Sequence, residues 1–328
     1  MIPWAAGGNV MPSDAKPILV IGSLNMDLVA RCERLPRVGQ TVFGQDFFTA
    51  PGGKGATQAV AAAKLGARVA MAGCVGHDQF GRDLIAGLQA AGVGTDAVIP
   101  VDHPTGTALI TVDAAGANTI VVISGANMAC DMALIDRAIA GPDGPGILLL
   151  QHEISPEANT HAIRAARRAG WFIVLNPAPA RAVSADLLPL IDIIAPNETE
   201  AAAITGRIIV NRADAIAAAR HLVAAGARST LVTLGSNGAL YCDGSGVWHC
   251  PAVTVQAVDT TAAGDAYIGA LGTALAEGRT VRDSLGFAAA AAALSVTRLG
   301  AQPSLGASAE VADFIARYGA PSVEALTA

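Results

Sequence analysis

Short apolar runs alternate along this chain with longer alanine-rich stretches, and this alternation restricts the possible folds more than any other feature. The apolar runs lie at residues 18–21, 69–74, 147–150, 172–175, 191–195 and 231–234. Continuous apolar strands separated by helices are typical of a parallel sheet that helices cover on both faces. The pattern therefore predicts an α/β fold with a mainly parallel central sheet.

Two stretches interrupt this pattern. Residues 27–50 and 105–124 contain Thr, Val, Ile and Phe in partly alternating order with glycine turns, which predicts antiparallel strands outside the main sheet. Residues 1–16 lack the basic start and apolar core of a secretory signal, so we interpret them as a loose N-terminal extension. The sequence leaves open whether translation starts at Met1 or at Met11. We expect one domain over residues 17–320, followed by a C-terminal tail over residues 321–328.

Composition limits the classes of partner. The most apolar stretch, residues 287–296, is too short for a membrane span, which needs ~20 residues. A net charge of -6 without a basic run argues against nucleic acid as the main partner. Five widely spaced cysteines without a Cys-x-x-Cys pair favour a reduced cytoplasmic protein without structural zinc. We therefore expect neither a nucleic acid nor a membrane partner.

Residues 259–265 read Asp-Thr-Thr-Ala-Ala-Gly-Asp and run directly into an apolar helical stretch. Small side chains would let the backbone N–H groups of Ala262, Ala263 and Gly264 face outward at the helix N-terminus, where the helix dipole favours an anion. Asp265 would then lie beside a bound phosphate, where a carboxylate can take a proton from an attacking hydroxyl. The same residues also suit an ordinary helix entrance, because Asp is a common N-cap.

A second glycine-rich segment lies far upstream, at residues 51–66. It reads Pro-Gly-Gly-Lys-Gly-Ala-Thr-Gln-Ala-Val-Ala-Ala-Ala-Lys-Leu-Gly. Glycines before a run of helix formers indicate close approach of the backbone to a ligand, although they also suit a packing helix behind a glycine turn. The segment lacks the P-loop spacing, and residues 22–25 lack the dinucleotide fingerprint. Neither of the two common nucleotide-binding motifs therefore occurs at these turns.

Together these two segments resemble the two signatures of the ribokinase-like (PfkB) carbohydrate kinases. Further similar stretches follow in the same order at residues 22–27, 175–181, 195–200, 233–238 and 297–304. The resemblance covers roughly residues 17–318, and chance matches of short motifs would rarely extend so far in order. It implies a ribokinase-like three-layer α/β/α domain with a small β-strand lid over the sugar, and an ATP-dependent kinase activity.

The resemblance assigns one set of residues to the sugar. Asn25 and Asp27 follow the first apolar run, at a strand end where open parallel sheets bind ligands, although Asn-x-Asp by itself also suits an Asx turn. Glu153 follows another apolar run and matches the family's sugar-binding Glu, and we interpret the adjacent His152 as a structural or rim residue. The implied sugar-binding residues are Asn25, Asp27, Gly53, Lys54, Thr57, Glu153 and Asp265.

The resemblance also implies an ATP site. Asn197 and Glu200 match groups that hold phosphates and the water shell of Mg²⁺, and Glu suits this role because magnesium keeps several waters. By themselves these two residues suit a capped helix N-terminus equally well. The implied nucleotide-binding residues are Asn197, Glu200, Thr233, Gly235, Ser236, Gly238 and Gly264.

A site for K⁺ as an activating monovalent cation is implied beside the anion-binding turn. Two loops supply its ligands in the resembling family, mostly as carbonyl oxygens, which suit such an ion. Residues 300–304 alone also read as a helix stop with glycine and proline. The implied ligands come from Asp259, Thr261, Ser295, Arg298, Gly300 and Ser304.

The expected reaction is transfer of the γ-phosphoryl group of MgATP to a primary hydroxyl, with Asp265 as the base. D-ribose, giving D-ribose 5-phosphate, is the first candidate acceptor. Thr57 departs from the family, which usually carries Asn there, and a hydroxyl replaces an amide that offers both donor and acceptor groups. Another pentose, a ketohexose or a nucleoside therefore stays open as the acceptor.

Two further expectations concern the whole protein. A non-catalytic sugar-binding protein could retain the same fold. Asp265, Gly264, Lys54 and Glu200 favour turnover instead, because binding alone needs no base beside an anion hole. The expected partners are ATP and a small sugar. The resemblance also implies a homodimer through the lid strands, whose exposed edges need cover.

Overall fold

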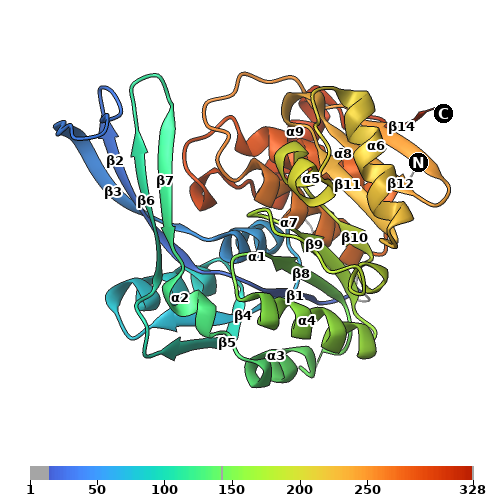
Figure 1. Ribbon diagram of the computed structural model, residues 1–328, viewed down its shortest axis with the longest axis horizontal. Coiled ribbons are helices and arrows are strands. Elements are labelled where there is room, and N and C mark those ends of the chain that lie inside the picture. The colour runs from blue at the N-terminus through green and yellow to red at the C-terminus, as the bar shows by residue number, and fades with distance from the viewer. Residues whose placement is uncertain (1–14, 142, 327–328) are drawn as a thin grey trace.

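The computed structural model describes residues 15–141 and 143–326, in which a large sheet carries helices on both faces (Figure 1). The sheet has ten strands in the order β14-β13-β12-β11-β10-β9-β8-β1-β4-β5. The strands from β11 to β5 run parallel, which confirms the mainly parallel sheet. Their bounds are β1 Ile18–Ile21, β4 Val69–Gly76, β5 Gly94–Val101, β8 Ile147–Gln151, β9 Phe172–Asn176, β10 Ile193–Ile194 and β11 Ser229–Thr233.

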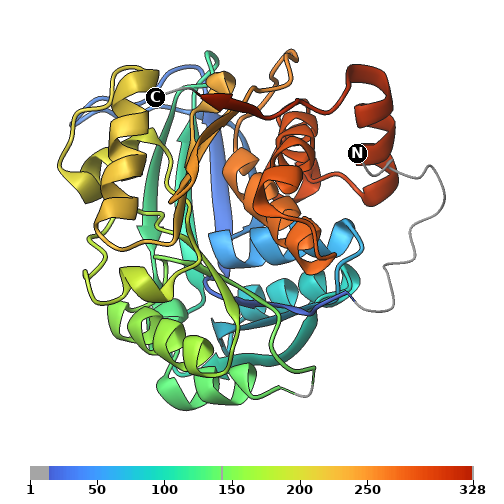
Figure 2. The same ribbon diagram turned by 90° about the vertical axis from the view of Figure 1, so that its right-hand side faces the viewer.

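Helices cover both faces of this sheet because its strands are apolar on both sides. Val20 and Leu149 pack toward α1, α2, α7, α8 and α9, whereas Leu19 and Leu148 pack toward the face that carries α3 and α4. Leu222 of α6 joins the second core, and α5 packs beside α6 (Figure 2). The bounds are α1 Lys54–Lys64, α2 Gln79–Ala90, α3 Met132–Ile139, α4 Pro156–Arg168, α5 Glu198–Thr205, α6 Arg212–Ala224, α7 Ala263–Ala276, α8 Val281–Ser295 and α9 Ser308–Tyr318. None of the described helices combines the length and the apolarity that a bilayer crossing requires.

The lid is a separate four-stranded sheet in the order β3-β2-β6-β7 that projects from the body (Figure 1). Its strands are β2 Asn25–Cys32, β3 Gly44–Gly52, β6 Gly106–Val112 and β7 Asn118–Ile123. The two hairpins are antiparallel as expected, but β2 and β6 pair in parallel. An alternating sequence pattern indicates which face of a strand is buried and carries no information on the direction of its neighbour, so this pairing was not predictable.

Some edge strands were also not foreseen. β5 alternates in burial and contains Pro100, both of which suit an edge strand. At the other edge, β12 Ala239–Asp243, β13 Gly246–Cys250 and β14 Glu324–Leu326 continue the sheet antiparallel. Residues 324–326 of the expected C-terminal tail therefore lie in the sheet. Met11 and most of the expected N-terminal extension lie outside the described residues.

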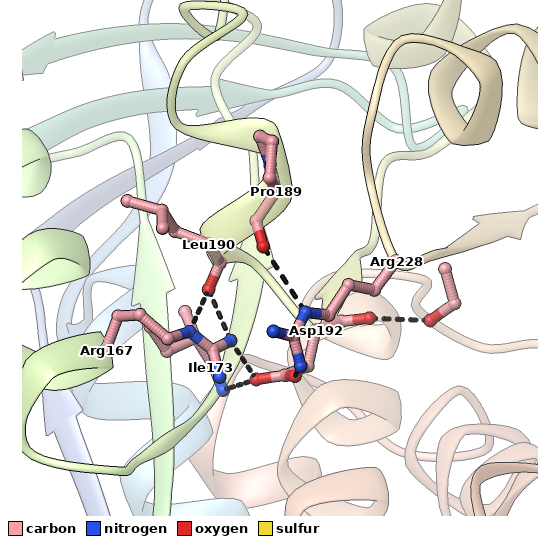
Figure 3. A network of polar contacts seen from close by, with 7 residues as sticks. Arg167, Ile173, Pro189, Leu190, Asp192 and Arg228 are labelled. Carbon is pink, nitrogen blue, oxygen red and sulfur yellow. Dashed lines mark hydrogen bonds and ion pairs between the residues drawn. The ribbon is translucent and has the colours of Figure 1, made fainter.

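A buried ion-pair network ties the amino-terminal edge of the sheet together (Figure 3). Asp192 is 8% exposed, and its Oδ2 accepts hydrogen bonds from Arg167 Nη2 at 2.6 Å and from the Ile173 N–H at 2.7 Å. Arg228 Nη1 donates to Oδ1 at 3.2 Å. Asp192 lies just before β10, and its carboxylate thereby connects this strand to the end of α4, to β9 and to the loop before β11. These contacts lie at the edge of the sheet opposite to the carboxyl ends of the strands.

We predict that Asp192→Ala lowers the free energy of unfolding by about 3 kcal/mol, because it removes the carboxylate that pairs with two guanidinium groups and accepts from a buried N–H, and leaves the guanidinium groups only carbonyl acceptors. Urea denaturation measures this change. Asp143→Ala is the control, since Asp143 pairs with Arg68 at 3.1 Å where both side chains are about half exposed, and its loss should stay below about 1 kcal/mol. Equal losses from the two variants would contradict the structural role of the network.

Candidate active site

The predicted sugar-binding residues meet at the carboxyl edge of the parallel strands. Residues that follow β1 and β8 face the first turns of α1 and α7 across a cavity of about 550 Å³. Ala108, Ile110, Ile120 and Val122 of the lid close one side of it. All of the residues expected at the sugar line this cavity: Asn25, Asp27, Gly53, Lys54, Thr57, Glu153 and Asp265.

Gly53 lets the start of α1 approach the turn after β1. Its φ is 84°, and a Cβ there would lie 2.7 Å from the backbone nitrogen of Asn25. The approach brings the Lys54 N–H within 3.0 Å of Glu153 Oε2, which also accepts a hydrogen bond from the Ser23 hydroxyl. The glycine at position 53 therefore allows tight packing of α1 on the turn after β1, and this packing places the start of α1 beside the cavity.

Asn127 is a residue of the site that sequence reasoning missed. It is buried, and its Nδ2 donates to Asn25 Oδ1 at 2.7 Å while its Oδ1 accepts from the Leu24 N–H at 2.9 Å. This contact fixes the amide of Asn25, whose nitrogen has no acceptor among the described residues. Asn127 lies in a 3-10 turn at Gly125–Ala129, after the lid, and no motif marks it.

Carboxylates and one lysine share the cavity. Burial, followed by repulsion from Glu153, raises the pKa of Asp27 to about 7. Burial also raises the pKa of Asp265, against the opposing effect of the Lys54 ammonium group. The pKa of Lys54 is raised in turn, mainly by the charge of Asp265, with smaller contributions from Glu153 and Glu200. Lys54 therefore holds its positive charge among carboxylates, and two of these carboxyl groups are easier to protonate than usual.

His152, adjacent to Glu153, also lines the cavity and is 9% exposed. Burial and the nearby Arg181 lower the pKa of His152 to about 4, so the ring is neutral at physiological pH. Arg181 donates from Nη2 to the His152 carbonyl at 2.6 Å and to the Ile154 carbonyl at 3.0 Å. These contacts agree with the expectation that His152 is a structural or rim residue.

Asp265 lies in the first turn of α7, directly after the predicted anion-binding turn. Ala262 is the N-cap of α7 with φ 63° and ψ 7°, a left-handed conformation that costs an alanine about 1–2 kcal/mol. The Ala263 N–H forms a long 3.3 Å bond to the Thr260 carbonyl. The N–H groups of Ala262 and Gly264 have no acceptor among the described residues. The strained turn therefore keeps backbone donors beside the carboxylate of Asp265.

The predicted nucleotide residues gather at the neighbouring strand ends. Asn197 and Glu200 form a capping box at the start of α5. The Asn197 N–H donates to Glu200 Oε2 at 2.9 Å, and the Glu200 N–H donates to Asn197 Oδ1 at 2.8 Å. Asn197 also bridges to Thr233 at the end of β11, ahead of the turn with Gly235, Ser236 and Gly238. None of these residues lines the sugar cavity. Burial raises the pKa of the Glu200 carboxyl group. The cap and a ligand-binding role are compatible.

The two loops expected at the monovalent cation lie together. The Asp259 carboxylate accepts from the N–H of Thr261 at 2.9 Å and from that of Gly300 at 2.8 Å. Burial works against ionisation of Asp259, but these hydrogen bonds outweigh it and lower its pKa. The Arg298 guanidinium donates to Glu310 at 2.6 Å, away from the loops. Backbone carbonyls are therefore the groups that Arg298 and Gly300 can offer to an ion.

The hydroxyl groups of Ser295 and Ser304 turn back into their own segments. Ser295 donates to the Ala292 carbonyl at 2.8 Å, and Ser304 donates to the Ala301 carbonyl at 2.7 Å. Both serines are fully buried. Their side chains thus support the shape of the second loop, which agrees with a set of ligands made mostly of carbonyl oxygens.

Comparison with known proteins gives consistent matches. A model of the pfkB family carbohydrate kinases matches residues 15–307. The chain is 40% identical to the ribokinase of Schizosaccharomyces pombe, over 90% of this chain and 96% of that protein. It is 38% identical to a deoxyribokinase of Salmonella typhi, over 88% and 94% of the two chains. The structure of Arabidopsis thaliana ribokinase complexed with ribose and ATP has a TM-score of 0.83 and 33% identity, covering 92% and 99% of the two chains.

We predict that Asp27→Asn stabilises the protein, and more so at high pH. The pKa of Asp27 is about 7 in the folded protein against an ordinary value of 3.8. Between pH 3.8 and about pH 7 the folded state keeps a proton on Asp27 that the unfolded chain has released. The wild type therefore loses stability as the pH rises through this range. The gain should be about 1 kcal/mol larger near pH 8.5 than near pH 6 in urea denaturation.

Asp83→Asn, on the exposed side of α2, is the matched control for this experiment. An equal gain from both variants at both pH values would contradict the role of burial at Asp27.

Proposed function

The chain belongs to the pfkB family of carbohydrate kinases, and on this basis we propose that it transfers the γ-phosphoryl group of ATP to the primary hydroxyl of D-ribose, giving D-ribose 5-phosphate. The observation that carries the proposal is the single cavity shared by the sugar-binding set and Asp265, with the strained anion turn beside it. The named ribokinases cover nearly the whole chain at up to 40% identity.

In the proposed mechanism Asp265 accepts the proton of the primary hydroxyl as its oxygen bonds to the γ-phosphorus. The bond from this phosphorus to the bridging oxygen breaks, and ADP leaves with the electron pair. The N–H groups of the turn at Ala262–Gly264 and the helix dipole of α7 stabilise the charge on the transferred group. Asn25, Asp27 and Glu153 hold the remaining hydroxyls, and the lid excludes water.

Mg²⁺ supplies charge neutralisation to the phosphates when it is bound with ATP. Glu200 would hold it through water, and this fits because, among the described residues, Oε2 of that carboxylate accepts from the N–H of Asn197 and Oε1 accepts no hydrogen bond. The loops of Asp259 and Gly300 would hold K⁺ through backbone carbonyls. The Asp259 carboxylate, which bonds to N–H groups of both loops, supports this arrangement.

Thr57 sets the main question about the acceptor. It is 2% exposed and lines the cavity, where a threonine hydroxyl can satisfy fewer sugar hydroxyl contacts than an asparagine amide. The relative named deoxyribokinase makes 2-deoxy-D-ribose the second candidate, since that sugar presents one hydroxyl fewer. D-ribose stays first because every other residue expected at the sugar lines the cavity.

A homodimer through the lids forms part of the proposal. One lid face lines the cavity, while Leu109 and Val121, which are paired on the other face, are 50% and 60% exposed. An apolar sheet with free edges favours a partner of the same kind. We place the enzyme in the cytoplasm, in keeping with its use of ATP and its five buried free thiols.

We predict that Asp265→Asn reduces turnover by ~10²–10⁴-fold, the usual value of a positioned general base. Sugar binding should change little, because an amide has nearly the same shape as the carboxyl. ADP and sugar phosphate are measured with MgATP across D-ribose, 2-deoxyribose, arabinose, fructose, tagatose and adenosine.

Asp313→Asn, on the exposed side of α9, is the control and should keep wild-type turnover. An Asp265→Asn variant within a few-fold of wild type would remove Asp265 from the role of base. If the wild type forms no sugar phosphate with any of these acceptors, the proposed function is overturned. If it prefers another sugar, Thr57 is the first position to change.

We also predict faster turnover in potassium than in sodium or cesium buffers. Asp259→Asn should increase the potassium concentration that gives half-maximal activity, because it weakens the hydrogen bonds that hold the two loops together. Steady-state kinetics over a series of salt concentrations at constant ionic strength measures both effects. Equal activity in the three salts would refute the cation site.

A further inference from the structure

Gln58 of α1 is fully buried and contacts the proposed base directly. Its Nε2 donates to Asp265 Oδ1 at 2.8 Å and to Asn176 Oδ1 at 3.2 Å. Its Oε1 accepts from Gln151 Nε2 at 2.7 Å. One glutamine side chain thus joins the ends of β8 and β9 to the first turn of α7.

The partners of Gln58 determine which way its amide points. The nitrogen of Gln58 faces two acceptors, Asp265 Oδ1 and Asn176 Oδ1, while its oxygen accepts from Gln151 Nε2. The amide of Asn176 is oriented in turn, because its Nδ2 donates to the Ala195 carbonyl at 2.9 Å and leaves its oxygen for Gln58. An amide nitrogen has two N–H groups, and both of those on Gln58 are occupied. The donor to Asp265 therefore cannot exchange with an acceptor by rotation of the amide.

This arrangement has two consequences for the carboxylate of Asp265. Burial raises the pKa of Asp265, whereas the hydrogen bond from Gln58 favours the ionised form and opposes that shift. The bond also engages Oδ1, whereas Oδ2 accepts no hydrogen bond from the residues that the structure describes and is therefore the freer oxygen to take a proton. A base works only when it is ionised and aimed at the hydroxyl, and the same contact serves both conditions.

We propose that Gln58 is a positioning residue that keeps Asp265 ionised and selects Oδ2 as the proton acceptor. The inference rests on the proposed role of Asp265 in phosphoryl transfer. The packing contribution of Gln58 is a separate property, because a methionine of similar length fills the same space without the hydrogen bonds. The two properties can therefore be measured independently.

The test compares kcat as a function of pH for the wild type, Gln58→Met and Gln58→Glu, with ATP and the best acceptor. Loss of the donor should move the acid limb of kcat upward by about one pH unit and lower kcat near neutral pH by about tenfold. Gln58→Glu should move it further, since a second carboxylate beside Asp265 opposes ionisation. The sugar KM should stay within about threefold of wild type, because ground-state sugar contacts are unchanged.

Asp192→Ala provides the control for a purely structural effect, because it lowers stability from the opposite edge of the sheet and should leave the acid limb in place. Gln151→Met extends the test without touching Asp265, since it removes the hydrogen bond to the oxygen of Gln58 and loosens the hold on that amide. It should move the limb in the same direction by less.

If Gln58→Met does not fold, Gln58→Glu and Gln151→Met decide the question. Unchanged acid limbs in the folded variants, with an active wild type, would overturn the positioning role and leave the proposed function intact. An inactive wild type would instead count against the proposed function itself.

Discussion

The site depends on the close packing of helix α1 against helix α7. A Cβ on Gly269 would lie 2.6 Å from the Cβ of Ala61 and 2.9 Å from the carbonyl oxygen of Gln58, so only glycine fits at this crossing. The contact brings Gln58 within hydrogen-bond distance of Asp265, although 207 positions separate them in the chain. The alanine-rich composition has a physical purpose here, because small side chains let two helices approach closely enough for their first turns to share one cavity.

Charge in the cavity and at the nearby start of α5 is balanced at some cost in stability. Asp27, Asp265 and Glu200 each have a pKa raised chiefly by burial, and the Lys54 ammonium group opposes this for Asp265 and Glu200. Carboxylates held in this way are poor choices for a stable core, because the folded state disfavours their ionised forms. They are suitable groups for binding hydroxyls and for accepting a proton. The same burial that costs stability therefore prepares the chemistry.

Stability and function occupy opposite edges of the sheet. At the amino edge the buried carboxylate of Asp192 is paired with Arg167 and Arg228, whereas the carboxyl edge carries backbone N–H groups without acceptors among the described residues and a strained Ala262. Strain and unpaired groups persist only where surrounding structure enforces them. The well-packed sheet between the two edges supplies that support. The lid exposes apolar residues on its outer face.

The sequence by itself determined the parallel sheet, the two motifs at the cavity and a set of residues that line it. Its apolar runs became β1, β4, β8, β9, β10 and β11, because continuous apolar strands can be buried only between helices. Tertiary structure alone decided the parallel pairing of β2 with β6, the strand β14, and the contacts of Asn127 and Gln58. Local patterns record whether a side chain is buried. They do not record which distant side chain it meets, because hydrogen bonds across more than a hundred residues depend on how the helices pack.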